Sequence, residues 1–594
     1  MTVVDRPPIA PSARPRNAAL ESTFRTFDGT ELFYRAWLPT EPARRALILL
    51  HRGHEHSGRY DDLVAQLDLP DTAIFAHDAR GHGRSPGERG YASTFAALVK
   101  DVDEFARFVS TTHGIPIADM AILGHSVGAV VAAAWVHDYA PPVRGMVLAT
   151  PALKVRLYVP LAMPALRAKN AVSRKPSFIT SYVRPSMLTH DATEAQRYAD
   201  DPLISKQIAV SVLIDLRDTA DRLLADAGAI RTPTLIQTAG SDWVVDNRAA
   251  KRFLDRLGTS EKSIRHYNGF GHSIFHEVDR DQPVADVRSF LLRAFDQEAN
   301  DESILDADRT GYTRDEFDRL SKPRSAACPK RAMFALQTLG MKTGGRLSRG
   351  ISIGWKRGFD SGESLDHVYG GRAEGMTPLG RLIDRGYLNA IGWRGIRQRK
   401  ANLIALLTRA IDDIARGGEP VRIVDIASGP GRYLLETLKQ CAAKDVHANL
   451  RDCSEPGLQA GRALAEKLGV TSVTYERGDA FDTESLASIA PRPNIAVVSG
   501  LYELFPDNAP IRASLAGLAR ALPTDGYFVY TNQPWHPQVE MIARCLINRD
   551  GKPWIMRRRT QAEMDALVRA AGFEKIAMEI DRWGIFTVSL ARRA

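Results

Sequence analysis

Residues 120–139 read MAILGHSVGAVVAAAWVHDY and decide the fold of the first half of the chain. A short apolar strand runs directly into the turn GHSVG (124–128), and the turn opens an apolar helix. Glycines flank the serine because Cβ atoms would clash where a strand turns this sharply into a helix. The turn lifts Ser126 above the sheet, and the N–H of Val127 at the helix N-terminus faces a developing oxyanion. This context favours a nucleophilic serine over a turn serine without chemistry.

The sheet that carries this turn is predicted over residues 21–295. Short β-branched runs alternate there with helix-like segments, which is the pattern of a parallel α/β sheet. The runs are RALILL (45–50), TAIFAH (72–77), MAILG (120–124), GMVLAT (145–150), PTLIQTA (233–239) and SIRHYN (263–268). The alternation stops over residues 151–231, which are rich in Pro, Arg and Leu. We expect this stretch to form an inserted helical cap.

A serine needs a base to become a nucleophile, and the base needs an acid to orient it. On this type of sheet the chain order is Ser, then Asp, then His. Asp242 follows the run PTLIQTA and His272 follows SIRHYN, so both are expected in loops at carboxyl ends of strands. Asp246 and His276 are the alternatives, with Asp246 at a predicted helix N-cap. We favour Ser126, Asp242 and His272 as the catalytic residues.

The loop after the first run, HRGHEHS (51–57), is predicted to provide the second oxyanion donor through the backbone of Gly53. Its three histidines also allow a metal site to be considered. No acidic cluster completes such a site, so we predict no metal. The alternative is that His51 and His56 hold the loop by hydrogen bonds.

Five stretches together resemble the monoglyceride lipase and lysophospholipase branch of the α/β-hydrolases, over about residues 25–295. They are HEHSGRY, FAHDARGHGRSPGERG, GHSVG, AGSDWVVD and GFGHSIFHE. The resemblance implies a mobile cap over an acyl-chain tunnel and cleavage of esters of single-chain lipids. It assigns Ser126 as nucleophile, Asp242 as acid and His272 as base, with Gly53 and Val127 as oxyanion donors. The family usually has glycines where this chain has Arg52 and His54.

The predicted cap begins with a basic, apolar segment, PALKVRLYVPLAMPALRAKNAVSRKPSF (151–178). It holds six Lys or Arg and no Asp or Glu. Such a segment suits an anionic membrane surface or an amphiphilic substrate. An ordinary cap that packs on the sheet and keeps a solvated basic face fits the composition equally well.

A second α/β alternation begins after residue 419, and its first unit is VRIVDIASGPGRYLLETL (421–438). Asp425 ends the strand, and Gly429 and Gly431 let the backbone approach a ligand before the helix starts. A dinucleotide fingerprint would need a third glycine near Leu434, so NAD is the weaker interpretation. The next two strands end in acids that suit a nucleoside: Asp452 for the ribose hydroxyls and Asp479 near the adenine ring.

This order resembles the class I S-adenosylmethionine-dependent methyltransferases over about residues 395–594. The resemblance implies a Rossmann-like seven-stranded sheet with an antiparallel last strand, and S-adenosyl-L-methionine as cofactor. It gives cofactor-binding roles to Asp425, Gly429, Gly431, Asp452 and Asp479, and it places SGLYELFPD (499–507) near the point of methyl transfer. The Gly/Arg-rich segment 331–394, with Tyr369, Tyr387 and Trp393, is expected to form a helical lid. The alternative is a domain that keeps the sheet but binds no cofactor.

Composition limits the remaining possibilities. The chain has 594 residues, which suggests several domains. Its net charge of +9 is mild for this size and does not indicate nucleic acid. Cys328, Cys441, Cys453 and Cys545 are too few and too scattered for a disulfide framework, which favours a cytoplasmic protein, peripheral to the inner face of the membrane if the cap binds lipid.

Two further segments complete the predicted organisation. Residues 1–20 are Pro-rich, without the apolar region of a signal peptide, and are expected to be disordered. Residues 296–330 begin with the polar, acidic stretch DQEANDESILDADRTGYTRDEFDRL and are predicted to be a linker.

The sequence therefore predicts a bifunctional enzyme of the α/β class. An N-terminal serine hydrolase would cleave a lipid-like ester, and a C-terminal methyltransferase would act on an unassigned acceptor. The first alternative is that the N-terminal half is an acyltransferase or thioesterase, because a triad does not choose water as its acceptor. The second is that the C-terminal half is a non-catalytic module that binds a cofactor or docks on a membrane.

Overall fold

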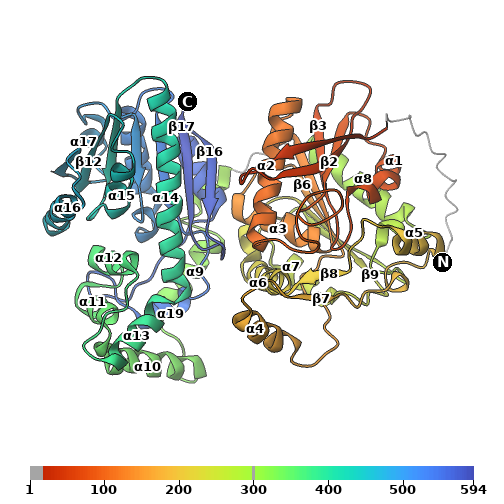
Figure 1. Cartoon of the computed structure of the whole chain (residues 1–594), viewed down its shortest axis with the longest axis horizontal. Coiled ribbons are helices and arrows are strands. Elements are labelled where there is room, and N and C mark those ends of the chain that lie inside the picture. Colours follow the sequence, from red (N-terminus) through yellow and green to blue (C-terminus); the bar gives the residue numbers. More distant parts are fainter. Residues whose placement is uncertain (1–17, 298–301) are drawn as a thin grey trace. The chain divides into compact units, whose positions relative to one another are not determined.

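The computed structural model describes residues 18–297 and 302–594. The chain divides into two compact units, residues 1–300 and residues 301–594, each built on its own sheet (Figure 1). Most of the predicted disordered N-terminus, residues 1–17, lies outside the described residues. The first strand already begins at Leu20.

The first unit is an eight-stranded sheet in the order β1-β2-β4-β3-β5-β6-β9-β10. β1 and β2 pair antiparallel, β2 pairs antiparallel with β4, and the remaining strands run parallel. The strands are β1 (Leu20–Arg25), β2 (Glu31–Trp37), β3 (Arg45–Leu50), β4 (Thr72–His77), β5 (Met120–His125), β6 (Gly145–Ala149), β9 (Thr234–Ala239) and β10 (Lys262–Tyr267). The central strands β3 to β6 are almost wholly buried, as expected where helices cover both faces of a parallel sheet.

The helices of this unit connect successive strands. They are α1 (Asp61–Leu67), α2 (Phe95–His113), α3 (Val127–Tyr139), α7 (Asn247–Arg256) and α8 (Asp281–Asp296). α3 is buried along nearly its whole length, because its small and β-branched residues let it pack closely against β5 and β6. The eight strands and their helices form the α/β-hydrolase fold that the sequence predicts.

An insertion between β6 and β9 forms the cap. It contains α4 (Ala162–Val172), β7 (Phe178–Thr180), α5 (Ala192–Asp200), β8 (Gln207–Ala209) and α6 (Val210–Asp226). The prediction of a purely helical cap is incomplete, because β7 and β8 pair as a small antiparallel sheet. No residue of α4 is buried, whereas α6 packs on α2 and α3.

The second unit is a seven-stranded sheet in the order β13-β12-β11-β14-β15-β17-β16. β17 is antiparallel to both of its neighbours, and the other pairs are parallel. The strands are β11 (Val421–Ile426), β12 (Val446–Asp452), β13 (Val473–Arg477), β14 (Ile495–Val498), β15 (Tyr527–Asn532), β16 (Phe573–Ile580) and β17 (Thr587–Arg593). The Rossmann-like sheet with an antiparallel last strand is confirmed.

Helices cover this sheet and extend beyond its carboxyl edge. Those that flank the strands are α14 (Ile391–Arg416), α15 (Arg432–Gln440), α16 (Glu455–Leu468), α17 (Thr483–Ala487), α18 (Asn508–Ala521), α19 (Val539–Cys545) and α20 (Gln561–Ala570). Four more helices form the segment predicted as a lid: α10 (Pro329–Lys342), α11 (Arg349–Arg357), α12 (Gly362–Gly370) and α13 (Pro378–Leu388). These helices share an apolar core with α14 and α19.

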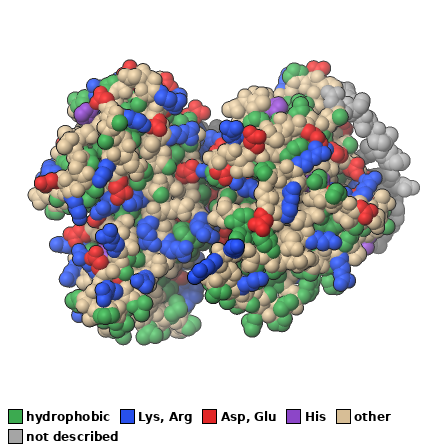
Figure 2. Space-filling view, viewed as in Figure 1, with side chains coloured by type: hydrophobic (Ala, Val, Ile, Leu, Met, Phe, Trp, Pro, Cys, Tyr) green, Lys and Arg blue, Asp and Glu red, His purple; other side chains and the backbone are tan. Residues whose placement is uncertain are grey.

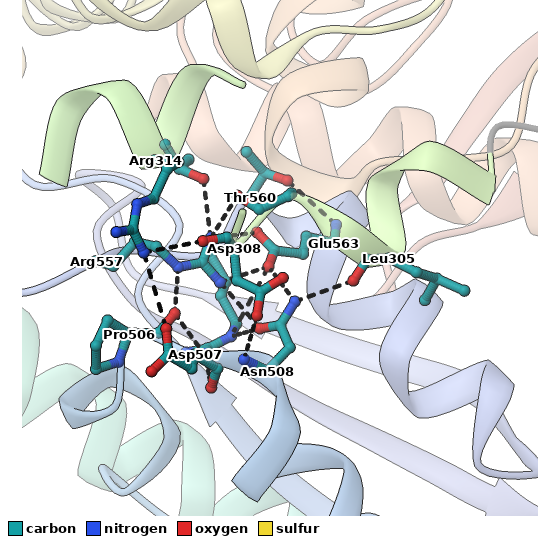
Figure 3. Close-up of polar contacts among 12 residues, drawn as sticks. Leu305, Asp308, Arg314, Pro506, Asp507, Asn508, Arg557, Thr560 and Glu563 are labelled. Carbon is teal, nitrogen blue, oxygen red and sulfur yellow. Dashed lines mark hydrogen bonds and ion pairs between the residues drawn. The ribbon is translucent and has the colours of Figure 1, made fainter. Parts of the chain in front are cut away.

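The segment predicted as a linker is in large part a structural element of the second unit. Residues 302–306 form a short 3-10 helix and α9 spans Tyr312–Ser321. Asp308 accepts a hydrogen bond from the backbone N–H of Asn508 at 2.7 Å (Figure 3). Arg557 donates to Thr313 at 3.0 Å. Arg557 also forms a wholly buried ion pair with Glu563 at 2.7 Å.

Candidate active sites

In the first unit, Ser126 occupies a sharp turn between β5 and α3. Its backbone has φ 56° and ψ −110°, which a non-glycine residue adopts only under constraint. A Cβ at residue 124 would lie 2.4 Å from the carbonyl oxygen of residue 128, and a Cβ at residue 128 would lie 2.4 Å from that of Leu50. Both glycines of the motif are therefore required for the turn to form.

The side chains of Ser126, His272 and Asp242 form a continuous hydrogen-bonded series. His272 Nε2 lies 2.8 Å from Ser126 Oγ, and His272 Nδ1 lies 2.9 Å from Asp242 Oδ2. The other carboxylate oxygen of Asp242 accepts from the backbone N–H groups of Val244 and Val245 at 2.8 and 2.9 Å. Burial opposes ionisation of Asp242, but His272 and these hydrogen bonds outweigh it and lower the pKa of the carboxyl group.

The alternative acid and base lie outside this series. Asp246 caps the N-terminus of α7 by accepting from the backbone N–H of Arg248, and it forms ion pairs with Lys154 and Arg248. His276 contacts Ser273 Oγ at 3.0 Å and the carbonyl oxygen of Arg59 at 3.1 Å. The structure therefore brings together the favoured residues and gives the alternatives structural contacts.

The loop after β3 lies beside the serine turn. A Cβ at Gly53 would lie 3.2 Å from Cγ2 of Val127, so the two predicted oxyanion donors are neighbours. Arg52 turns its guanidinium to Glu55, in a buried ion pair at 2.7 Å. His54 has a φ of 74°, in the left-handed region that favours glycine. His54 therefore adopts a backbone conformation that glycine adopts more easily.

Histidines hold this loop in place. His51 accepts a hydrogen bond from the backbone N–H of Ala79 at 3.0 Å, and His56 Nε2 lies 2.9 Å from Asp201 of the cap. Among the residues that the structure describes, no cluster of His, Cys, Asp or Glu is arranged to hold a metal ion.

The cap exposes large apolar side chains beside its basic residues. Tyr158, Val159, Leu161 and Val172 are all more than half exposed. Lys154 and Arg167 pair with Asp246 and Asp218. Lys169, Arg174 and Lys175 are exposed, and no carboxylate in the described ranges pairs with them. Within those ranges, no helix has the length and hydropathy that would let it span a bilayer.

In the second unit, residues 427–431 form a tight loop between β11 and α15. Ala427, Gly429 and Gly431 all have positive φ angles, between 53° and 65°. A Cβ at Gly429 would meet no atom within 4 Å, whereas one at Gly431 would lie 2.1 Å from Cδ2 of Leu450. Gly429 therefore faces open space that a ligand can fill, while Gly431 is required for packing.

Asp452 is the acid that contacts this loop. As the last residue of β12, it accepts hydrogen bonds from the backbone N–H of Gly429 and of Ser454, one on each carboxylate oxygen and both at 2.8 Å. A carboxylate oxygen has a second lone pair, so both oxygens are still able to accept ribose hydroxyls. Asp479 is exposed two residues past β13, next to Gly478, whose N–H donates to the backbone oxygen of Asp452.

Asp425, to which the sequence analysis assigns a cofactor-binding role, is the fifth residue of β11. Its carboxyl group is fully buried and accepts a hydrogen bond from the hydroxyl group of Tyr433 at 2.6 Å. Burial raises the pKa of this carboxyl group to about 8. This shift favours the protonated form at neutral pH.

A cavity of about 380 Å³ lies between the helices α10, α13 and α14 and the loops that follow β14 and β15. Tyr387 and Trp393, which the sequence analysis assigned to the lid, are among its lining residues. The lining residues Arg399, Glu503 and Gln533 were not predicted. They come from three distant segments, and the only sequence signal was the stretch 499–507, to which methyl transfer was assigned.

Comparisons with known proteins agree with this division. A family model described as "Putative methyltransferase" matches residues 287–593, and one described as "Serine aminopeptidase, S33" matches residues 41–279. A protein of Escherichia coli (strain K12) that carries only the description of an uncharacterized protein, YnbC, is 46% identical over 96% of this chain and 98% of its own length.

Two relatives match the first unit alone. The human monoglyceride lipase is 29% identical and covers 42% of this chain and 86% of its own length. The phospholipase YtpA of Bacillus subtilis (strain 168) is 25% identical and covers 43% of this chain and 97% of its own length.

Proposed function

The chain belongs to the methyltransferase family whose model matches residues 287–593, and from this premise we propose that it is a bifunctional enzyme. Its first unit hydrolyses esters of single-chain lipids, of the monoacylglycerol or lysophospholipid type. Its second unit transfers a methyl group from S-adenosyl-L-methionine. The observation that carries the hydrolase half is the unbroken series from Asp242 through His272 to Ser126.

In the hydrolase reaction, Ser126 Oγ attacks the ester carbonyl while His272 Nε2 takes its proton. Asp242 remains ionised because its pKa is lowered, and it holds His272 Nδ1 as a donor. The backbone N–H groups of Gly53 and Val127 stabilise the oxyanion, since Val127 is the first residue of α3 and has no acceptor within its own helix.

The lipid character of the ester is supported by the cap and by the relatives. Exposed apolar side chains lie beside three cationic residues without a carboxylate partner in the described part of the chain, Lys169, Arg174 and Lys175. This arrangement suits peripheral contact with an anionic bilayer. The experiment compares turnover of a monoacylglycerol, a lysophospholipid and a short soluble ester, with fluorophosphonate labelling of Ser126. Hydrolysis of the short ester alone would contradict the lipid assignment.

The residues of the second unit fit S-adenosyl-L-methionine. Gly429 leaves open space at the loop, Asp452 can accept from the ribose, and Asp479 stands at the same edge of the sheet. When bound, the cofactor supplies an electrophilic methyl group. The chain's own residues bind it, hold the acceptor and exclude water. Titration calorimetry with S-adenosylmethionine and S-adenosylhomocysteine tests this assignment, which the absence of heat from both would contradict.

A further inference from the structure

The cavity of the second unit has an apolar body. Trp393, Met541, Trp554, Met556 and Phe586 are among the residues that line it. Aromatic rings offer large flat contacts, and methionines adapt to the shape of a ligand. The volume of about 380 Å³ lies within the range of about 300–1,000 Å³ that is usual for small-molecule sites.

One end of the cavity is polar, and its polar atoms are incompletely paired. Arg399, Glu503 and Gln533 are 3%, 8% and 5% exposed. Arg399 Nε, Glu503 Oε2 and Gln533 Nε2 are buried and find no hydrogen-bond partner within the described part of the chain. Three other lining residues also have a buried polar atom without a partner there: Asp360 Oδ1, Tyr387 Oη and Trp554 Nε1. Leaving such groups unpaired costs about 1–3 kcal/mol each, so their concentration around one cavity, with Arg399, Glu503 and Gln533 together at its polar end, indicates a ligand that satisfies them.

The remaining contacts of these residues fix their positions. Glu503 Oε1 accepts from Thr531 Oγ1 at 3.0 Å and lies 3.6 Å from Arg399 Nη1. Arg399 Nη2 donates to the hydroxyl group of Tyr369 at 3.2 Å. The positive charge of Arg399 is thus already balanced by Glu503, and the polar end as a whole is close to neutral.

His536 adds a further donor. Its Nδ1 accepts a hydrogen bond from the backbone N–H of Gln538 at 3.0 Å, and burial lowers the pKa of the ring to about 3. The ring is neutral, so its single proton is on Nε2, which lies within 2.7 Å of where a Cβ at Gly392 would stand. His536 and Gly392 both line the cavity.

We propose that this cavity binds the methyl acceptor, and that the acceptor is an apolar molecule with one free hydroxyl group. The hydroxyl hydrogen would bond to Glu503 Oε2, and its oxygen would accept from Gln533 Nε2. A carboxylate would instead face the negative charge of Glu503, whose counter-ion is already engaged. This inference rests on the proposed methyltransferase function. Methylation exchanges the O–H bond for an O–CH3 bond, with S-adenosylhomocysteine as leaving group, and Glu503 takes the released proton.

The outer faces of the same helices suggest that the acceptor comes from a lipid phase. Met341 of α10 and Ile383 of α13 line the cavity. The same two helices expose apolar residues to solvent, among them Leu336 at 71% and Leu382 at 62%. Figure 2 shows hydrophobic side chains gathered over this part of the second unit. An amphiphilic alcohol suits both the apolar wall of the cavity and the exposed apolar faces of α10 and α13.

The test uses the full chain with Ser126 blocked by a fluorophosphonate, so that the probes do not bind at the hydrolase site. Calorimetry measures binding of 1-decanol, decanoate and decyl methyl ether, which share one chain length. We expect 1-decanol to bind about 10-fold more tightly than the other two, because hydrogen bonds to a charged group are worth about 1.5–3 kcal/mol. Tightest binding of decanoate, or equal binding of all three, would overturn the proposal.

Substitution of Glu503 tests the polar end directly. Glu503→Gln keeps the size and can still accept from Thr531, but it presents an amide donor to the ligand. We expect the preference for 1-decanol over decyl methyl ether to disappear, because an ether accepts a hydrogen bond and donates none. Glu540→Gln is the matched control: Glu540 lies on α19, pairs with Arg324 and does not line the cavity. A preference that survives Glu503→Gln would overturn the proposal.

Gln533→Leu keeps the test decisive if Glu503→Gln unfolds the unit. It removes a donor from the ligand oxygen, so 1-decanol and the ether should both bind about 3- to 10-fold more weakly. Unchanged binding of both would overturn the assignment. Titration of S-adenosylhomocysteine into the same preparations separates the two proposals, since decanol binding without cofactor binding refutes the methyltransferase and leaves an alcohol-binding cavity without a role in methyl transfer. Cofactor binding without decanol binding would leave the methyltransferase standing and overturn the assignment of the cavity.

Discussion

The two candidate sites differ in how their buried polar side chains are paired. In the first unit, Ser126, His272 and Asp242 are joined to one another within 2.9 Å. In the second, Arg399, Glu503 and Gln533 each keep a buried atom unpaired within the described residues. A serine hydrolase generates its nucleophile from its own side chains, so its site is complete before the ester arrives. A methyltransferase needs a cofactor and an acceptor, which complete its site when they bind.

The largest effect should come from the site of the first unit, which is built from the chain's own side chains. Ser126→Ala removes the nucleophile, and we expect ester turnover to fall by about 10⁴-fold or more, with loss of fluorophosphonate labelling. Cofactor binding should stay unchanged. Residual labelling of the variant would show that another nucleophile acts in the first unit.

The orienting acid should have the next largest effect. Asp242→Asn removes control of the His272 tautomer, and turnover should fall by about 10³- to 10⁴-fold. Asp246→Asn is the control, because Asp246 caps α7 and asparagine caps almost as well. Near-normal turnover for Asp242→Asn together with an inactive Asp246→Asn would reverse the assignment of the acid.

At the second site, Asp452→Ala should weaken S-adenosylhomocysteine binding by about 10- to 1,000-fold, because two charge-assisted hydrogen bonds to the ribose are lost. Calorimetry measures this change, and an ester assay on the same preparation provides the control. Glu455→Ala, on the exposed surface of α16 just beyond this strand, should leave the affinity unchanged. Unaltered binding by Asp452→Ala would exclude the predicted ribose contact.

Removing positive charge from the cap should have a smaller, salt-dependent effect, which is on membrane binding. Changing Lys169, Arg174 and Lys175 together to Gln removes three surface charges, each worth about 1 kcal/mol near an anionic bilayer. Sedimentation with anionic vesicles should fall by up to about 100-fold, and turnover of a short soluble ester should hardly change. Arg167 is left intact because its partner Asp218 already neutralises it. Equal loss in both assays would indicate a role in the substrate site itself.

The last effect is measured as stability and not as activity or binding, and it concerns Asp425. Its pKa is raised to about 8 in the folded chain, so the native state holds a proton that the unfolded state loses above about pH 4. Stability from this group is therefore present at low pH and is lost as the pH rises toward 8. Asp425→Asn should flatten this dependence, which thermal unfolding between pH 5 and 8 measures. If the stability of the wild-type protein and of Asp425→Asn changes with pH in the same way, this would contradict a buried neutral carboxyl group.

Ser126, Asp242 and His272 could be singled out from the sequence because each follows a recognisable strand or lies in a short motif, and the structure brings their side chains together. Asp452 could be singled out for the same reason. The catalytic and cofactor-binding roles of these residues stay predictions. Arg399 and Gln533 could not be singled out, and Glu503 only as part of the stretch 499–507, because the three come from α14 and from two loops that meet only in the folded chain. The acidic composition of residues 296–320 suggested a linker. In the structure, Glu316 and Asp308 instead pair with groups from segments more than 190 residues away.

The most direct test of two independent active sites is a titration of S-adenosylhomocysteine before and after fluorophosphonate blocks Ser126. We expect one cofactor per chain, the same affinity in both titrations, and complete loss of ester hydrolysis in the blocked protein. Absence of cofactor binding in the untreated protein would contradict the methyltransferase assignment. An affinity that changes on blocking would contradict the independence of the two sites.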